Sequence, residues 1–374
     1  MIRKIKGKCD KMRVEIEKDI WLLGRENGMA KKNIKKILIE ILKLKEVKAT
    51  KDLPLLASLA MAVPILIGLL SNNLKLGITA SLAAIMVVYF PLEGSFSERI
   101  LMLIGCSFGF ISVYTIGLIF SFNRIISVTV FGITVGIIHW TVSHFKLKPP
   151  KDFFFIMLCS TAISIPHQAI SKIAENIGYL TFGTLSTCLI VFLYCLIVGK
   201  KSSLNKTMNI PHIPLEIKKN VIESVIFAVF LSIALGAGYY LNLANPYWVA
   251  VACIAVMQGS SAQHIFLRSI QRVIGTLIGV IFCWGILLLV NNPWEICILI
   301  IIFQFIVEYL VPRNYGIAMI FITPMTIFLS EASTLFSKNH ILFIQGRFFN
   351  TLVGSLIGIV GGYIVYHEKI REII

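Results

Sequence analysis

Two stretches near the end of the chain place arginine, threonine and glycine at helical spacing. In the first, Arg272, Gly275, Thr276 and Gly279 recur at three- and four-residue intervals, so in a helix they share one face. An arginine guanidinium binds a carboxylate through two parallel hydrogen bonds and stays charged at any cellular pH. The stretch therefore has the chemistry of an anion-binding surface or of a close helix contact.

A second copy of this pattern follows, and the arginines of both copies leave two interpretations open. They line a path for an anion, or they anchor helix ends by extending to the membrane surface. We expect five polar residues on the substrate path: Arg272, Thr276, Arg347, Asn350 and Thr351. The glycines are expected to make close helix contacts: Gly275, Gly279, Gly354 and Gly358.

Other titratable groups in the apolar regions are few. Glu308 is a candidate for proton coupling, with a structural ion pair to Arg313 as the alternative. His139 and His264 are either proton relays or packing residues. The chain contains no Asp beyond Asp152, no phosphate-binding glycine loop, no Cys-x-x-Cys pair and no His-Glu-x-x-His motif. We therefore expect no cofactor, no metal and no enzymatic activity.

Composition predicts an all-α membrane protein, since 57% of residues are hydrophobic and only 14% are charged. Twelve apolar segments predict about twelve transmembrane helices. Two of the segments are short and must be extended or packed inside the bundle. The segments are 54–70, 76–90, 100–120, 125–145, 153–166, 177–198, 221–242, 246–259, 273–290, 293–311, 314–330 and 345–366. Tyr247 and Trp248 fit an aromatic belt, or a surface that stacks on an aromatic substrate.

Positive charge sets the expected orientation. Residues 1–52 supply half of the formal net charge of +16, and the linker 199–220 is also basic. Placing both in the cytoplasm, with the tail 367–374, satisfies the positive-inside rule and gives a multi-pass cell (inner) membrane protein. Residues 32–47 predict an amphipathic helix on anionic lipid, or one docked on the bundle. A nucleic-acid partner is not expected.

The segments divide into two six-helix units, 53–198 and 221–366. An even number of spans per unit predicts that the units are related by a pseudo-two-fold axis along the membrane normal. Arg272 would then enter its helix from the inner side and Arg347 from the outer side. We therefore expect an inverted pair of three-helix repeats within the second unit.

The second half resembles the fusaric acid resistance and aromatic acid exporter superfamily, with its integral membrane bound transporter domain. The resemblance covers about 221–366 and is carried by Pro246-Tyr247-Trp248, residues 268–279, Arg313-Asn314-Tyr315 with Thr323-Pro324, and residues 347–354. It implies secondary efflux of small organic anions, and a chain with two units that is its own pseudo-dimer or forms a homo-oligomer. The first half looks like a diverged copy, with Asn176 in the place of Arg347.

We therefore expect a secondary transporter that exports small organic anions, aromatic or carboxylated, across the cell membrane. An anion channel of the same fold is the first alternative. A membrane scaffold that transports nothing is the second.

Overall fold

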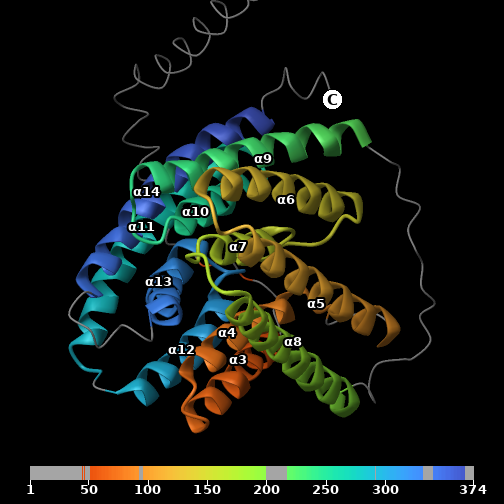
Figure 1. The fold of residues 1–374 in the computed structure, drawn as a ribbon, viewed down its shortest axis with the longest axis vertical. Helices are drawn as coiled ribbons and strands as arrows, with labels where there is room; N and C mark the ends of the chain where they lie inside the picture. The colour runs from red at the N-terminus through yellow and green to blue at the C-terminus, as the bar shows by residue number, and fades with distance from the viewer. Residues whose placement is uncertain are drawn as a thin grey trace, which may run out of the picture. The chain divides into compact units, whose positions relative to one another are not determined.

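The computed structural model describes residues 44, 46, 51–91, 96–198, 217–290, 292–331 and 340–366. Residues 46–374 form one compact unit, and residues 1–45 form another, of which only Leu44 is described. Nearly all of the amphipathic helix expected at 32–47, the linker 199–216 and the tail 367–374 lie outside the described residues. Within the described part every regular element is a helix, as composition predicts (Figure 1).

Each of the twelve apolar segments falls on one α-helix, and the second also covers a short 3-10 helix. The first half contains α3 (Asp52–Leu70), α4 (Leu74–Ala84) with the 3-10 helix η1 (Ile85–Tyr89), α5 (Phe96–Ile119), α6 (Arg124–His144), α7 (Phe153–Ile163) and α8 (Ile170–Val198). The second half contains α9 (Ile217–Tyr240), α10 (Tyr247–Met257), α11 (Ala262–Leu287), α12 (Pro293–Leu310), α13 (Tyr315–Glu331) and α14 (His340–Tyr366).

Helix length follows the same order in both halves. Eight helices are long and apolar enough to cross a membrane, and four apolar segments are shorter: Leu74–Tyr89, Phe153–Ile163, Tyr247–Met257 and Tyr315–Ser330. The short ones stand second and fifth in each half. An 11-residue helix is only about 16 Å long, roughly half the hydrocarbon thickness. Every residue of α10 is buried, so the two segments that seemed too short to span are packed inside the bundle.

Polar side chains begin several helices by accepting hydrogen bonds from free backbone N–H groups. Asn73 caps α4, Asn123 caps α6 and Asn292 caps α12. Ser261 caps α11 by accepting from the backbone N–H of His264 at 3.1 Å. These caps fix where each apolar segment starts to turn.

The helices of the two halves pair in the same way. In the first half α3 packs on α4, α4 on α8, and α5 on both α7 and α8; in the second half α9 packs on α10, α10 on α14, and α11 on both α13 and α14. The fourth helix of each half packs on the first helix of the other half, α6 on α9 and α12 on α3. Figure 1 shows α6 beside α9 and α12 beside α3. The halves are therefore interlocked.

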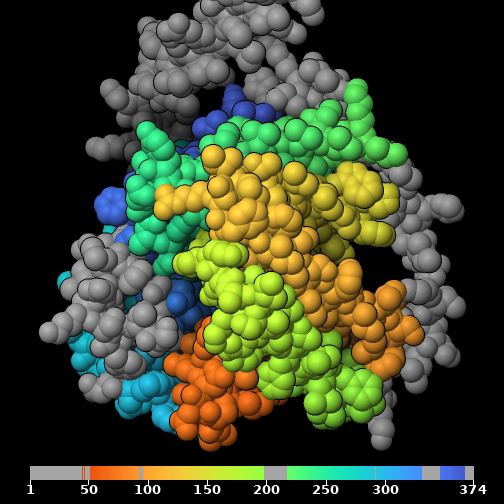
Figure 2. Space-filling view, in the orientation of Figure 1, coloured from red at the N-terminus to blue at the C-terminus, as the bar shows by residue number. Residues whose placement is uncertain are grey.

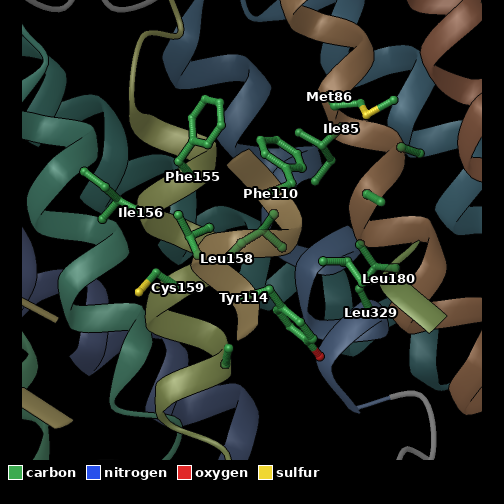
Figure 3. Packing of buried hydrophobic residues seen from close by; sticks show 14 of the residues in the cluster. Ile85, Met86, Phe110, Tyr114, Phe155, Ile156, Leu158, Cys159, Leu180 and Leu329 are labelled. Carbon is green, nitrogen blue, oxygen red and sulfur yellow. The ribbon is translucent and has the colours of Figure 1, made fainter. Parts of the chain in front are cut away.

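The interior of the first half is apolar and aromatic. The rings of Tyr89, Phe110 and Phe155 contact one another, with centroids 4.8 to 6.1 Å apart. Figure 3 shows Phe110 and Phe155 facing each other above Leu158 and Tyr114. Large apolar side chains are also exposed on the outside of α6, α8 and α9, whose surfaces are seen in Figure 2. An apolar exterior is the one a bilayer requires.

Candidate functional site

The helix that carries the first arginine begins earlier than its hydropathy indicates. The apolar segment starts at 273, whereas α11 starts at Ala262, so Arg272 lies ten residues into the helix. At 1.5 Å per residue this places it about 15 Å along the axis. The same helix includes Arg268, because the capped, polar first turns also belong to α11.

Arg272 is buried, with 3% of its surface exposed. Its Nη1 donates a hydrogen bond to the hydroxyl of Tyr315 at 2.6 Å and approaches the sulfur of Met319 at 3.9 Å. Arg268 lies over the ring of the same tyrosine, 4.4 Å from its centroid. The Nε atoms of both arginines are buried and have no hydrogen-bond partner among the described residues. This burial does not fit an anchor that reaches the membrane surface.

Arg347 is buried to the same degree, with 2% exposed. Its guanidinium carbon lies 3.3 Å from the ring centroid of Trp248, and its Nη2 donates to the hydroxyl of Thr326 at 3.2 Å. Its Nε and Nη1 have no partner in the described part of the chain. Trp248 is itself buried, so its assignment to an aromatic belt is wrong: the ring supports a cation inside the bundle.

The two arginines come from different helices and face a common interior. Their helices, α11 and α14, pack on each other. No described carboxylate lies within ion-pair distance, 4.0 Å, of either. The structure therefore holds two buried positive charges on neighbouring helices, without an acidic partner from the described residues.

The other three polar residues expected on the path have local partners or none. Asn350 donates from Nδ2 to the carbonyl oxygens of Ala244 and Asn245, which ties α14 to the loop before α10. Thr351 donates to the carbonyl of Arg347 at 2.9 Å, within its own helix. Thr276 is fully buried, and its hydroxyl has no partner in the described residues.

A small cavity opens beside Arg347. Its volume is about 10 Å³, which is the space of one water molecule. The lining residues are Ala244, Asn245, Trp248, Ile327, Ser330, Arg347 and Asn350. This cavity is too small for an organic anion, so the helices are closed around Arg347 in this conformation.

The glycines of both copies lie where two helices touch. A Cβ added to Gly275 would lie 2.5 Å from the Cβ of Met319, and one added to Gly279 would lie 2.7 Å from the Cβ of Thr323, both on α13. A Cβ added to Gly354 or Gly358 would lie too close to backbone carbonyl oxygens of α10. Each motif helix therefore packs on a short helix.

Glu308 does not pair with Arg313. Its Oε1 accepts a hydrogen bond from Nε2 of Gln304 at 3.0 Å, one turn back on α12. Arg313 instead donates to the carbonyl of Tyr309 and lies 3.7 Å over its ring centroid. The expected ion pair is wrong because Glu308 bonds to Gln304 and Arg313, in the turn after α12, bonds to Tyr309, both partners on α12.

Sequence reasoning missed the aromatic partners of the two arginines. Tyr315 begins α13 and binds Arg272, while Trp248 near the start of α10 supports Arg347. Each arginine thus meets the aromatic start of the short helix on which its own helix packs. The available signal was the similar start of the two short helices, Pro-Tyr-Trp and Arg-Asn-Tyr, which gives no contact by itself.

Comparison with known proteins finds similarity in the second half of the chain. Residues 232–361 match the family described as fusaric acid resistance protein-like. The "Uncharacterized membrane protein YvaC" of Bacillus subtilis is 32% identical over 127 residues, which are 34% of this chain and 20% of that protein. The "Uncharacterized protein YhfK" of Escherichia coli is 29% identical over 136 residues, 36% of this chain and 19% of that protein. The chain spans about a fifth of the length of these curated relatives, and no solved structure matches it. The resemblance stated from the sequence is confirmed over residues 232–361.

Proposed function

We propose that the chain is a secondary transporter. The proposal starts from two observations: eight helices are long and apolar enough to cross a membrane, and residues 232–361 match the fusaric acid resistance protein-like family. Its substrates are small organic anions, aromatic or carboxylated, which it exports across the cell membrane. The substrate path runs through the second half, between Arg272 and Arg347.

The single observation that carries this proposal is the pair of buried, uncompensated guanidinium groups. Burying an unpaired charge costs several kcal/mol, and charged side chains inside membrane spans mark ion or substrate pathways. Arg272 and Arg347 keep buried N–H donors that no described residue satisfies. A carboxylate between them would neutralise the charge and accept these hydrogen bonds. The face of Trp248 supplies an apolar surface for an aromatic ring.

The helix pairing supports alternating access. Most helix pairs of one half have a counterpart in the other, and the exchange of α6 on α9 for α12 on α3 supports a pseudo-two-fold between six-helix units. If α9, α10 and α11 correspond to α12, α13 and α14, then the contact of α11 with α13 corresponds to the contact of α14 with α10. The motif glycines lie at both of these contacts. We infer an inverted repeat in which the two arginines approach the midplane from opposite sides. Rocking of these repeats would open the closed site to one side at a time.

Transport by the purified protein tests the proposal directly. Proteoliposomes loaded with unlabelled phthalate or succinate are diluted into the same labelled dianion, and exchange is followed with time. Phthalate tests an aromatic substrate and succinate an aliphatic one, and both dianions cross bare lipid slowly. We expect protein-dependent exchange of at least one. Large currents that ignore the proton gradient would support a channel instead, and no movement of either anion would contradict the proposal.

The proposed orientation places both termini and residues 199–220 in the cytoplasm, where the basic N-terminal region meets anionic lipid. Single cysteines at Ser71 and Ser260, both exposed in loops, test it in a background lacking Cys9. In intact cells an impermeant maleimide should label Ser71→Cys, which follows α3. It should label Ser260→Cys, which precedes α11, only after the membrane has been permeabilised. The reverse pattern would contradict this orientation. The remaining cysteines on described helices are buried or half-buried and supply the background control.

A further inference from the structure

A buried histidine and aspartate form an ion pair away from the arginine site. Nδ1 of His139, on α6, lies 2.7 Å from Oδ2 of Asp152, and both side chains are buried. Asp152 stands at the N-cap position of α7 but makes no capping hydrogen bond. Its carboxylate is therefore not explained by the start of the helix.

Residues of the second half complete the pair. Gln258, which follows α10, donates from Nε2 to the other oxygen of Asp152 at 3.0 Å and to the carbonyl of Pro150 at 3.0 Å. Phe227, on α9, stacks on the imidazole of His139 with ring centroids 3.9 Å apart. One carboxylate thus links α6 and α7 of the first half to α10 of the second.

The imidazole retains one site for a proton. With Asp152 ionised, Nδ1–H of His139 donates to it, and Nε2 is buried with no partner among the described residues. A proton bound at Nε2 changes the buried net charge of the pair from −1 to zero, because histidinium and carboxylate cancel. Proton uptake therefore changes the net charge buried where His139 and Asp152 of the first half meet Gln258 of the second.

Direct packing connects the His139–Asp152 pair to Trp248, the ring that lies against Arg347. Phe153 and Met157, in the first turns of α7, pack on the cluster formed by Tyr247, Trp248 and Val251 of α10. Trp248 lies against the guanidinium of Arg347. Asp152 is the residue immediately before Phe153, so a shift of α7 at Asp152 is transmitted to the ring that supports Arg347.

We propose that His139 and Asp152 form the proton-binding site that couples a proton gradient to movement of the anion at Arg272 and Arg347. The proposal rests on the proposed transport function. It assigns coupling to the His139–Asp152 contact between the halves rather than to Glu308, whose carboxylate accepts a hydrogen bond from Gln304 on its own helix. The other titratable groups lie on α6, on α7 and on the helices packed against them. They are Glu98, Arg99, Cys106 and Tyr114 on α5, Arg124 and His144 on α6, Cys159 on α7, Lys218, Lys219, Glu223, Tyr239 and Tyr240 on α9, Tyr247 and Cys253 on α10, and Lys151 before α7 with Tyr89 of η1 bonded to its carbonyl.

The coupling test compares two transport modes in the same proteoliposomes. In wild-type protein we expect anion exchange without a gradient and a faster, gradient-driven net uptake of the same phthalate or succinate. His139→Gln and Asp152→Asn should keep exchange within about twofold, while net uptake falls to the rate measured without a gradient. Retained exchange shows that each variant is folded. His144→Gln, on the same helix and outside the pair, is the matched control and should keep gradient-driven uptake.

A second measurement needs no substrate. In a variant with Trp248 as the sole tryptophan, acidification should shift its fluorescence, because proton uptake at the His139–Asp152 pair moves α7 against α10. The shift should vanish with His139→Gln and persist with His144→Gln. An unchanged shift in His139→Gln, or gradient-driven uptake that survives both substitutions, would overturn the coupling proposal. Failure of wild-type exchange would overturn the transport function instead, and the fluorescence result would still decide whether the pair binds the proton.

Discussion

Replacing Arg347 by alanine is expected to lower anion exchange by a factor of ten to a hundred or more. A hydrogen bond to a charged group contributes about 1.5–3 kcal/mol, and each 1.4 kcal/mol is a tenfold change in binding. The loss should exceed that of one contact because Arg347 also brings charge to a site that contains no described carboxylate within ion-pair distance. Initial exchange rates over a range of anion concentrations separate weaker binding from slower turnover.

Two further variants show whether geometry or charge alone matters. Arg347→Lys keeps the charge but loses the planar fork and its stacking on Trp248, so it should recover only part of the activity. Arg124→Ala removes an exposed cation that contacts Asn242 at 3.4 Å and should leave exchange unchanged. Full activity in a folded Arg347→Ala protein would show that this arginine is structural and that the anion path lies elsewhere.

Hydropathy was sufficient to find the helices but not their starts. All twelve apolar segments became helices, because a lipid environment forces apolar stretches to satisfy their backbone hydrogen bonds internally. The first ten residues of α11 contain Gln263, His264 and Arg268, which lower hydropathy while the helix continues. Hydropathy therefore starts this span too late, and it placed Arg272 at a helix entrance rather than ten residues into the helix.

The spacing of the motifs indicated the two arginines, but it could not supply their partners. Tyr315 lies 43 positions from Arg272 in the sequence, and Trp248 is still further from Arg347. Such contacts depend on which short helix each motif helix packs against, and a single sequence does not contain that information. The His139–Asp152 pair was missed for the same reason, since Asp152 before α7 looks like an ordinary helix cap.

The first half shares much of the packing of the second but has one buried arginine, Arg99 on α5, where the second half has Arg272 and Arg347. Gly183 on α8 presses on the backbone of Ala80 in α4, as Gly354 on α14 presses on Val249 in α10. Asn176, at the position that matches Arg347, donates to Gln168 at 2.8 Å. The aromatic cluster around Phe110 fills its interior, and its described residues include no second buried arginine at the position of Arg347. Glycines thus maintain the architecture in both halves, while the arginines distinguish the half that we propose transports.

Among glycine-to-alanine substitutions in the second half, Gly354→Ala is expected to lower the stability of the protein most. The added Cβ would overlap the carbonyl oxygen of Val249 and lie 2.6 Å from the Cβ of Ala252, and backbone atoms cannot move aside as a flexible side chain can. Overpacking of this kind costs about 1–3 kcal/mol, and more where backbone must shift. We expect a lower melting temperature in detergent and loss of anion exchange, since α14 also carries Arg347.

Gly285 is the matched control, because it lies on α11 with nothing within 4 Å of an added Cβ. Gly285→Ala should leave the melting temperature unchanged or raise it, since alanine favours a helix over glycine by up to about 1 kcal/mol. Gly183→Ala should behave like Gly354→Ala, because an added Cβ there meets the backbone of Ala80 in the same way. If Gly183→Ala were tolerated while Gly354→Ala unfolded the protein, the two halves would not share one packing principle. The pseudo-two-fold relation between them would then have to be abandoned.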